Sequence, residues 1–167
     1  MSQEPTGQRE PTREPAPEHP EVRMPPPLLH LGGLLIGHGL DQALGWTLPD
    51  FPGRQTLATV LAVTGAILVV AALLQLARHR TTVMPHRAAR VLVTGGVFRL
   101  SRNPIYLSFA LLHLACALSL ASPGMLLMLL AVLWVMQTHV IAAEEAFHAR
   151  RFGDQWLDYR RRVRRWL

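Results

Sequence analysis

Two short polar clusters interrupt an otherwise apolar C-terminal half, and their residue types could bind a charged small molecule. The first is RNPIY at residues 102–106, which supplies a guanidinium, an amide and a phenol. The second is the adjacent pair Glu144 and Glu145. Carboxylates bind cationic groups, whereas arginine and asparagine side chains donate hydrogen bonds to anionic groups. Together the clusters could hold a ligand that carries both charges.

The apolar segments beside these clusters predict that the clusters meet at one end of a helical hairpin. Pro104 suits the first position of a helix, and Asn103 before it is a good N-cap residue. Two predicted spans, about 105–121 and 125–142, are joined only by Ser-Pro-Gly at 122–124, which favours an antiparallel pair. The glutamates therefore return to the membrane face at which the first of these spans begins.

The distribution of apolar residues predicts an all-α integral membrane protein with four transmembrane helices and a C-terminal amphipathic helix. Half of the 167 residues are hydrophobic, and they occur in long blocks. The first two spans are expected at about 28–48 and 55–77. The membrane domain, 28–167, follows a tail, 1–27, whose eight prolines and five glutamates predict disorder.

The arginines predict the orientation of these spans. The chain has a net charge of +6 and no lysine; six arginines lie in residues 78–102, one in residues 49–54, and seven after Ala142. By the positive-inside rule, both termini and the two polar clusters lie on the cytoplasmic side, with Arg99 and Arg102 at headgroup level. Because the arginines gather where apolar segments end, they indicate membrane orientation, and no nucleic-acid partner is expected.

Several residues inside the first and third spans need an explanation. An acid within a span is a functional candidate by default, but Asp41 lies near the far interface, where His38 could pair with it, and a structural role is favoured. His113 is expected to point into the bundle as a packed hydrogen-bonding residue. The spacing of Gly33 and Gly37 lets another helix approach closely.

In the C-terminal interfacial segment, 143–167, the residues that follow Phe152 and Gly153 predict an amphipathic helix with one aromatic face and one arginine face. The aromatic face is made by residues that recur at steps of three and four: Phe152, Trp156, Tyr159, Val163 and Trp166. Such a helix could lie on an anionic membrane surface, or it could fold back over the polar clusters as a lid.

Four motifs, in order and spacing, resemble the isoprenylcysteine carboxyl methyltransferase and phospholipid methyltransferase family of integral membrane methyltransferases. They are GVF at 96–98, RNPIY at 102–106, the glutamates at 144–145 and FGDQWLDYRRRV at 152–163. The resemblance implies that S-adenosylmethionine binds at the cytoplasmic face, between the last two spans and the C-terminal segment. It also implies a lipid, prenylated or other apolar small-molecule acceptor, reached from the bilayer.

The resemblance carries cofactor binding to eight residues of this chain: Arg102, Asn103, Pro104, Tyr106, Leu107, Glu144, Glu145 and Tyr159. Such a cofactor needs an acid for its ammonium, a donor for its carboxylate, and aromatic or acidic surroundings for its sulfonium. Methyl transfer is an in-line displacement that depends on positioning, for which Arg102 and Glu145 are the candidates. No metal is expected.

The chain also departs from the family pattern. Asn103 stands where many relatives have histidine, and because an amide does not titrate near neutral pH, this residue cannot act as a general base. Phe98 and Trp156 replace family tyrosines, and Ser108 replaces a common glycine.

Other interpretations stay open. The RNP sequence could simply mark the start of a span, with Tyr106 in the aromatic belt at the interface. A non-catalytic four-helix membrane subunit would pair the arginine and glutamate clusters structurally. A membrane reductase of the sterol type would require a nicotinamide cofactor. The sequence patterns indicate no particular oligomeric state.

Overall fold

The computed structural model describes residues 25–79 and 91–167, and all regular elements in these ranges are helices. They are α1 (Pro26–Leu44), α2 (Arg54–Arg78), the 3-10 turn η1 (Gly96–Arg99), α3 (Pro104–Ser119), α4 (Pro123–Val135), the π-helix η2 (Met136–Val140), α5 (Ile141–Phe152) and α6 (Asp154–Arg162). The predicted all-α class is confirmed for this part of the chain. The expected disorder of the N-terminal tail concerns mainly residues 1–24, which lie outside the described ranges, and Pro26 and Pro27 belong to α1.

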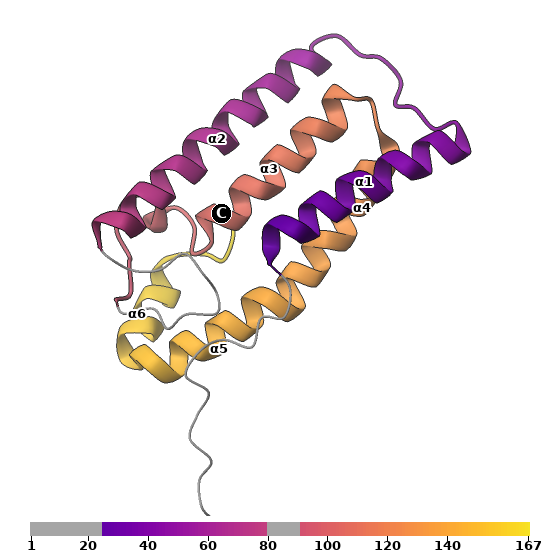
Figure 1. Ribbon diagram of the computed structural model, residues 1–167. Coiled ribbons are helices and arrows are strands. Elements are labelled where there is room, and N and C mark those ends of the chain that lie inside the picture. Colours follow the sequence, from indigo (N-terminus) through magenta and orange to yellow (C-terminus); the bar gives the residue numbers. More distant parts are fainter. Residues whose placement is uncertain (1–24, 80–90) are drawn as a thin grey trace, which may run out of the picture.

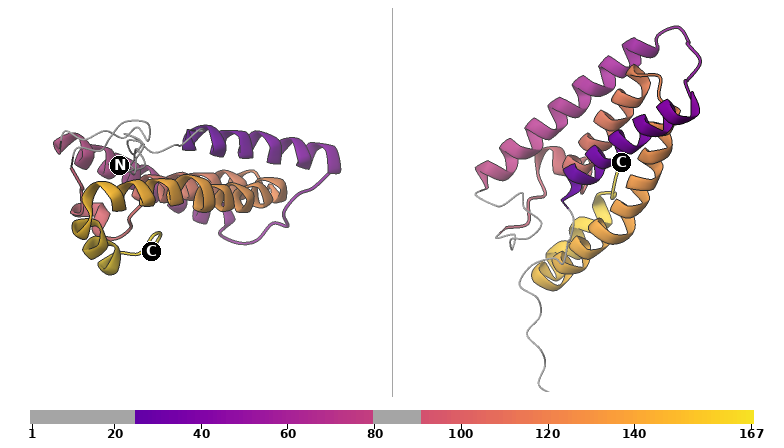
Figure 2. Two further views of the ribbon diagram at one scale, coloured as in Figure 1. Left: turned by 90° about the horizontal axis from the view of Figure 1, so that it is seen from below. Right: turned by 45° about the vertical axis from the view of Figure 1, so that its right-hand side comes forward.

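The long helices run side by side, with α3 between α2 and α4 and with α1 packed across α4 (Figure 1). Helix α4 continues through η2 into α5 as a single 30-residue helix, Pro123–Phe152. At Gly153 the chain reverses, and α6 turns back so that the C-terminus lies near the start of α3 (Figures 1 and 2). One end of the bundle therefore gathers α5, α6, η1 and the beginning of α3.

In residues 25–79 and 91–167, two helices, rather than the four predicted, are both long enough and apolar enough to cross a membrane. They are α2 and the continuous helix Pro123–Phe152, whereas α3 is apolar but has only 16 residues. Helix α1 has 19 residues, but four glycines, two histidines and an aspartate lower its apolar character. The prediction of four transmembrane helices is therefore not confirmed. The helix that contains the last predicted span continues without a break beyond residue 142, to Phe152.

Helix α2 has the exposure pattern of a helix that faces lipid. Only 17% of its most apolar 18-residue window is buried, whereas the core helix of a soluble protein would be mostly buried. Its exposed large apolar side chains include Val60, Val63, Ile67, Val70 and Leu74. An apolar surface of this extent is typical of a membrane-facing or partner-facing helix.

Helices α1 and α4 approach closely, as the glycine spacing predicts. A Cβ atom at Gly37 would lie 2.6 Å from the backbone N and Cα of Met125, and one at Gly33 would lie 2.9 Å from Val132 Cγ2. Neither position could accept a larger side chain without separating the two helices.

Asp41 joins the end of α1 to the start of α4. Its carboxylate accepts hydrogen bonds from the Gly124 N–H (2.7 Å) and from the Ser122 hydroxyl. Ser122 Oγ in turn accepts from the Met125 N–H at 3.0 Å. His38 is exposed, so its predicted pairing with Asp41 is wrong, whereas the favoured structural role of this acid agrees with its position.

His113 is buried in the bundle as predicted. Its Nε2 lies 3.1 Å from the Met125 carbonyl oxygen, and its Nδ1 lies 3.2 Å from His30 Nδ1. The histidine from α3 therefore links α1 and α4 as a packed hydrogen-bonding residue.

Candidate functional site

The hairpin of α3 and α4–α5 brings the two polar clusters together. Tyr106, one turn into α3, donates its hydroxyl to Glu144 Oε1 in α5 at 2.6 Å. Arg102, just before α3, lies next to Glu145, with 3.3 Å between Nη1 and Oε1. Arg102 and Tyr106 thus each contact a different glutamate of α5.

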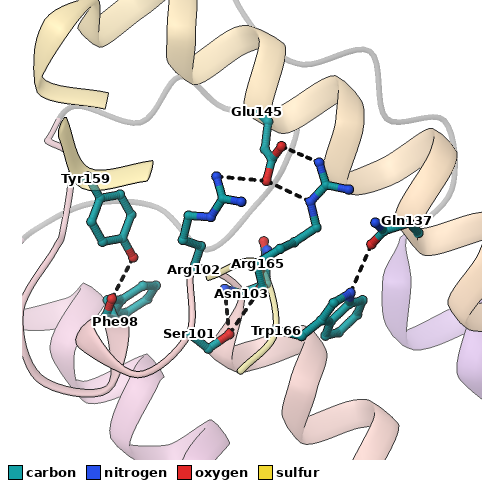
Figure 3. A network of polar contacts seen from close by, with 9 residues as sticks. All are labelled: Phe98, Ser101, Arg102, Asn103, Gln137, Glu145, Tyr159, Arg165 and Trp166. Carbon is teal, nitrogen blue, oxygen red and sulfur yellow. Dashed lines mark hydrogen bonds and ion pairs between the residues drawn. The ribbon is translucent and has the colours of Figure 1, made fainter. Parts of the chain in front are cut away.

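Glu145 is the centre of a buried charge network, and its second partner comes from the C-terminus (Figure 3). Arg165 donates from Nε to Oε1 at 3.0 Å and from Nη2 to Oε2 at 2.5 Å. The Glu145 side chain is only 11% exposed. One carboxylate therefore lies between two guanidinium groups, and the hydrogen bonds to both of its oxygens come from Arg165.

Arg102 is buried with donors to spare. Its side chain is 9% exposed, and its guanidinium carbon lies 5.5 Å from the centre of the Trp156 ring. Within the described residues, Nε and Nη1 make no hydrogen bond, since the contact of Nη1 with Glu145 is an ion pair without hydrogen-bond geometry. The C-terminal residues cover Arg102, and its position at headgroup level stays a prediction. A buried guanidinium with unused N–H groups is suited to bind an anion.

The last residues, 164–167, which we call the C-terminal strap, cross the start of α3. The Arg102 N–H donates to the Arg164 carbonyl at 3.0 Å, and the Ser101 hydroxyl donates to the Arg165 carbonyl at 3.2 Å. Asn103 Nδ2 donates to the same Arg165 carbonyl at 3.0 Å. The prediction that the Asn103 side chain caps α3 is therefore wrong, because this amide holds the strap instead.

Helix α6 turns its aromatic face inward, which matches the fold-back alternative rather than the surface helix. Trp156, Tyr159 and Val163 form a buried cluster, and α6 ends at Arg162, before Trp166. Tyr159 donates its hydroxyl to the Phe98 carbonyl in η1 at 2.7 Å. Burial raises the pKa of Tyr159 to about 12, although nearby Arg102 acts in the opposite direction. The phenol is therefore neutral near physiological pH and anchors α6 to η1.

An apolar groove of about 440 Å³ lies beside the charge network, between α3, the α4–η2 helix and the strap. Its lining residues are Leu107, Ala110, Leu133, Trp134, Gln137 and Trp166. Trp166 Nε1 donates to Gln137 Oε1 at 2.9 Å, so the strap closes one side of the groove (Figure 3). Gln137 belongs to the π-helix η2, a rare helix type that often occurs at functional sites.

Residues 54–155 match the family model described as phospholipid methyltransferase. The chain belongs to this family. It is also 28% identical over 134 residues to Protein-S-isoprenylcysteine O-methyltransferase A of Arabidopsis thaliana, covering 79% of this chain and 64% of that relative. The chain thus spans less than two-thirds of the relative's length. No solved structure matches the chain.

Membership of the phospholipid methyltransferase family confirms the resemblance drawn from the motifs, since both the family and the Arabidopsis thaliana relative are described as methyltransferases. It does not favour the non-catalytic subunit or the sterol-type reductase. Within residues 25–79 and 91–167, no group of three or more metal-ligating side chains is placed to hold a metal ion.

The eight predicted cofactor residues of this family member fall into four groups. Arg102, Tyr106 and the two glutamates form polar pairs, and Leu107 lines the groove. Pro104 is buried at the start of α3. The side chains of Asn103 and Tyr159 hold the strap and α6, and cofactor binding by all eight residues stays a prediction.

The sequence interpretation missed Arg165 and Trp166 as parts of the site. The sequence patterns identify Arg165 only as one of seven arginines after Ala142 that indicate orientation, and Trp166 only as part of an aromatic face. Both follow the end of α6, where no helical period applies, so their contacts depend on how the chain turns back. Gln137 carries a signal, because it is a polar residue within the predicted apolar span 125–142, on the helix that also bears the two glutamates.

Proposed function

We propose that this member of the phospholipid methyltransferase family is an integral membrane enzyme that uses S-adenosylmethionine to methylate a lipid-borne or other apolar acceptor. The observation that carries the proposal is a buried pair of opposite charges, Arg102 and Glu145, beside an apolar groove at one end of the bundle. The charged pair would bind the amino-acid group of the cofactor, and the adjacent groove would bind the apolar chain of the acceptor.

The residues present fit the amino-acid part of the cofactor. The unused Nε and Nη1 groups of Arg102 would bind its carboxylate, and a glutamate would bind its ammonium. Glu145 is the better candidate for the ammonium, because it lies beside Arg102, so the two groups can bind the ammonium and the carboxylate of one amino-acid moiety. Tyr106 and Glu144 would then provide the aromatic and acidic surroundings that a sulfonium prefers.

The groove suits an acceptor with a hydrocarbon chain. Five of its six lining residues are apolar or aromatic, and Gln137 is the polar exception. When bound, the cofactor supplies an activated methyl group, so the protein needs no nucleophile of its own. Holding the acceptor atom about 3–3.5 Å from that methyl, in line with the bond that breaks, provides much of the catalysis.

The topology belongs to the same proposal. α2 and the helix Pro123–Phe152 would span the bilayer, and α1 and α3 would complete a bundle of four crossings. The arginine-rich end, with both chain termini and the active site, would face the cytoplasm.

Isothermal titration with S-adenosylhomocysteine tests the proposed function. We expect saturable binding to the detergent-solubilised protein and none of NADPH. Glu145→Gln and Glu144→Gln should each weaken binding, because they remove a charge from the site. Asp158→Asn is the matched control, because this acid lies at the same end of the molecule with a side chain that is 64% exposed.

Two outcomes would contradict the proposal. If folded wild-type protein bound no S-adenosylhomocysteine, the methyltransferase activity would be excluded for this chain. If the three variants bound equally well, the assignment of the glutamates would be wrong. After a positive result, isoprenylcysteine and phospholipid acceptors should be screened, with Ala110→Phe as a variant that fills the groove and spares the charged pair.

A further inference from the structure

The buried network around Glu145 contains one more positive charge than negative. Two guanidinium groups, from Arg102 and Arg165, face a single carboxylate, and no other acid forms an ion pair with them among the described residues. Burying charge without a partner is costly, so this arrangement favours the arrival of an anion or the departure of a cation.

The two arginines are held to different degrees. Arg102 is 9% exposed in its side chain and precedes α3, whose helix fixes its position. Arg165 is 26% exposed and belongs to the strap, which follows Val163 in extended conformation (φ −122°, ψ 132°). Arg165 is therefore the cation that can leave.

We propose that Arg165 occupies the position of the ligand's ammonium group, so that the C-terminal strap must move away before the ligand binds. This inference rests on the proposed function. With Arg165 withdrawn, Glu145 loses the donor of the hydrogen bonds to both of its oxygens and keeps only the ion pair with Arg102, whose Nε and Nη1 make no hydrogen bond within the described residues. An amino-acid group, which carries an ammonium and a carboxylate on one carbon atom, complements this pair in both charges.

The strap also connects the charge network with the groove. Trp166 is next to Arg165 in the chain and is bonded to Gln137 in the groove wall (Figure 3). Displacement of Arg165 would therefore disturb the Trp166 contact as well. Cofactor binding would thereby alter the side of the groove that the strap closes, which makes the strap a structural link between cofactor and acceptor.

Titration of Arg165→Gln with S-adenosylhomocysteine, beside the wild type, tests this proposal. If only a fraction of the wild-type protein has the strap open, its apparent affinity for the ligand is reduced by that fraction. Removing the Arg165 guanidinium, which competes with the ligand, should therefore tighten binding by roughly 5- to 150-fold. Arg164→Gln is the matched control. It removes the same charge from an exposed neighbouring side chain and keeps the backbone carbonyl that holds the strap. It should bind as the wild type does.

The outcomes separate this proposal from the proposed function. If the wild type binds and Arg165→Gln binds equally or more weakly, the strap proposal is wrong while the cofactor assignment stands. If none of the folded proteins binds, both are wrong.

A second measurement on the wild type guards against a folding defect in the variant. Hydrogen–deuterium exchange at the backbone N–H of Arg102, which donates to the Arg164 carbonyl, should become faster when S-adenosylhomocysteine is added, because this hydrogen bond to the strap opens. Unchanged or slower exchange in the liganded protein would overturn the proposal.

Discussion

Replacing Asp41 distinguishes the structural acid of α1 from the acids of the candidate site. Alanine removes the acceptor for the Gly124 N–H and the Ser122 hydroxyl, and with it the negative charge at the start of α4. A hydrogen bond to a charged group contributes about 1.5–3 kcal/mol, and a charge at a helix N-terminus about 0.3–1 kcal/mol. Because the hydroxyl can find another acceptor, we expect Asp41→Ala to lower the free energy of unfolding by about 2–4 kcal/mol.

The expected change is large enough to measure by thermal unfolding in detergent. For a chain of this length, 1 kcal/mol corresponds to about 2–4 °C in Tm, so Asp41→Ala should lower Tm by roughly 4–16 °C. Asp41→Asn keeps an oxygen for the Gly124 N–H and should cost only about 1 kcal/mol, mainly through the lost charge. His38→Ala, at an exposed position on the same helix, should change stability by less than about 0.5 kcal/mol.

The same samples decide whether Asp41 has any role in binding. Its contacts connect α1 with the start of α4. This is the opposite end of the continuous helix Pro123–Phe152 from the end that carries Glu145. The affinity of the folded Asp41 variants for S-adenosylhomocysteine should therefore equal that of the wild type. An Asp41→Asn protein with normal Tm and lost binding would refute this reasoning and place a ligand site at the other end of the bundle.

Three further substitutions test the packing and the anchors. Gly37→Leu should separate α1 from α4 and destabilise the bundle strongly in thermal unfolding, whereas Gly39→Leu, with no atom within 4 Å of its added Cβ, should be tolerated; equal effects would contradict the close approach. Tyr106→Phe leaves a carboxylate of α5 without its hydroxyl donor and should cost about 1.5–3 kcal/mol of unfolding free energy. Burial raises the pKa of Tyr159 to about 12, whereas the pKa in the unfolded chain is about 10. The stability that the neutral phenol contributes is therefore complete below a pH of about 10 and is lost as the pH rises through about 12. The Tm difference between wild type and Tyr159→Phe should therefore shrink between pH 9 and pH 12, and a constant difference would show that this titration does not contribute.

Local signals were sufficient to predict the framework of the site. Pro104 marks the first residue of α3, and the short Ser-Pro-Gly connection forces α4 back along α3, so the meeting of Tyr106 with Glu144 follows from helix geometry. The approach of α1 through Gly33 and Gly37 likewise follows from spacing, because only glycine permits the observed backbone distance.

The contacts that sequence could not predict depend on tertiary placement. The Asn103 side chain has the chemistry of an N-cap, but in the structure it bonds to the Arg165 carbonyl, a partner 62 residues away. Arg165 itself follows the last helix, so no periodicity assigns it a face. The polar residues of α1 also show why a long segment does not by itself predict a span, since length is only one of the two requirements.

The two ends of the bundle each contain a buried acid, Asp41 at one end and Glu145 at the other. The hydrogen-bond partners of the two carboxylates differ, which explains why a ligand is proposed only at Glu145. At the Asp41 end, both oxygens accept hydrogen bonds from the start of α4, and a ligand would have to break contacts that the fold needs. At the Glu145 end, the partner is a guanidinium on an extended segment, and the neighbouring Arg102 retains unused donors within the described residues. Binding energy is available where a buried charge lacks a fixed partner, so a ligand with both charges gains more at the Glu145 end.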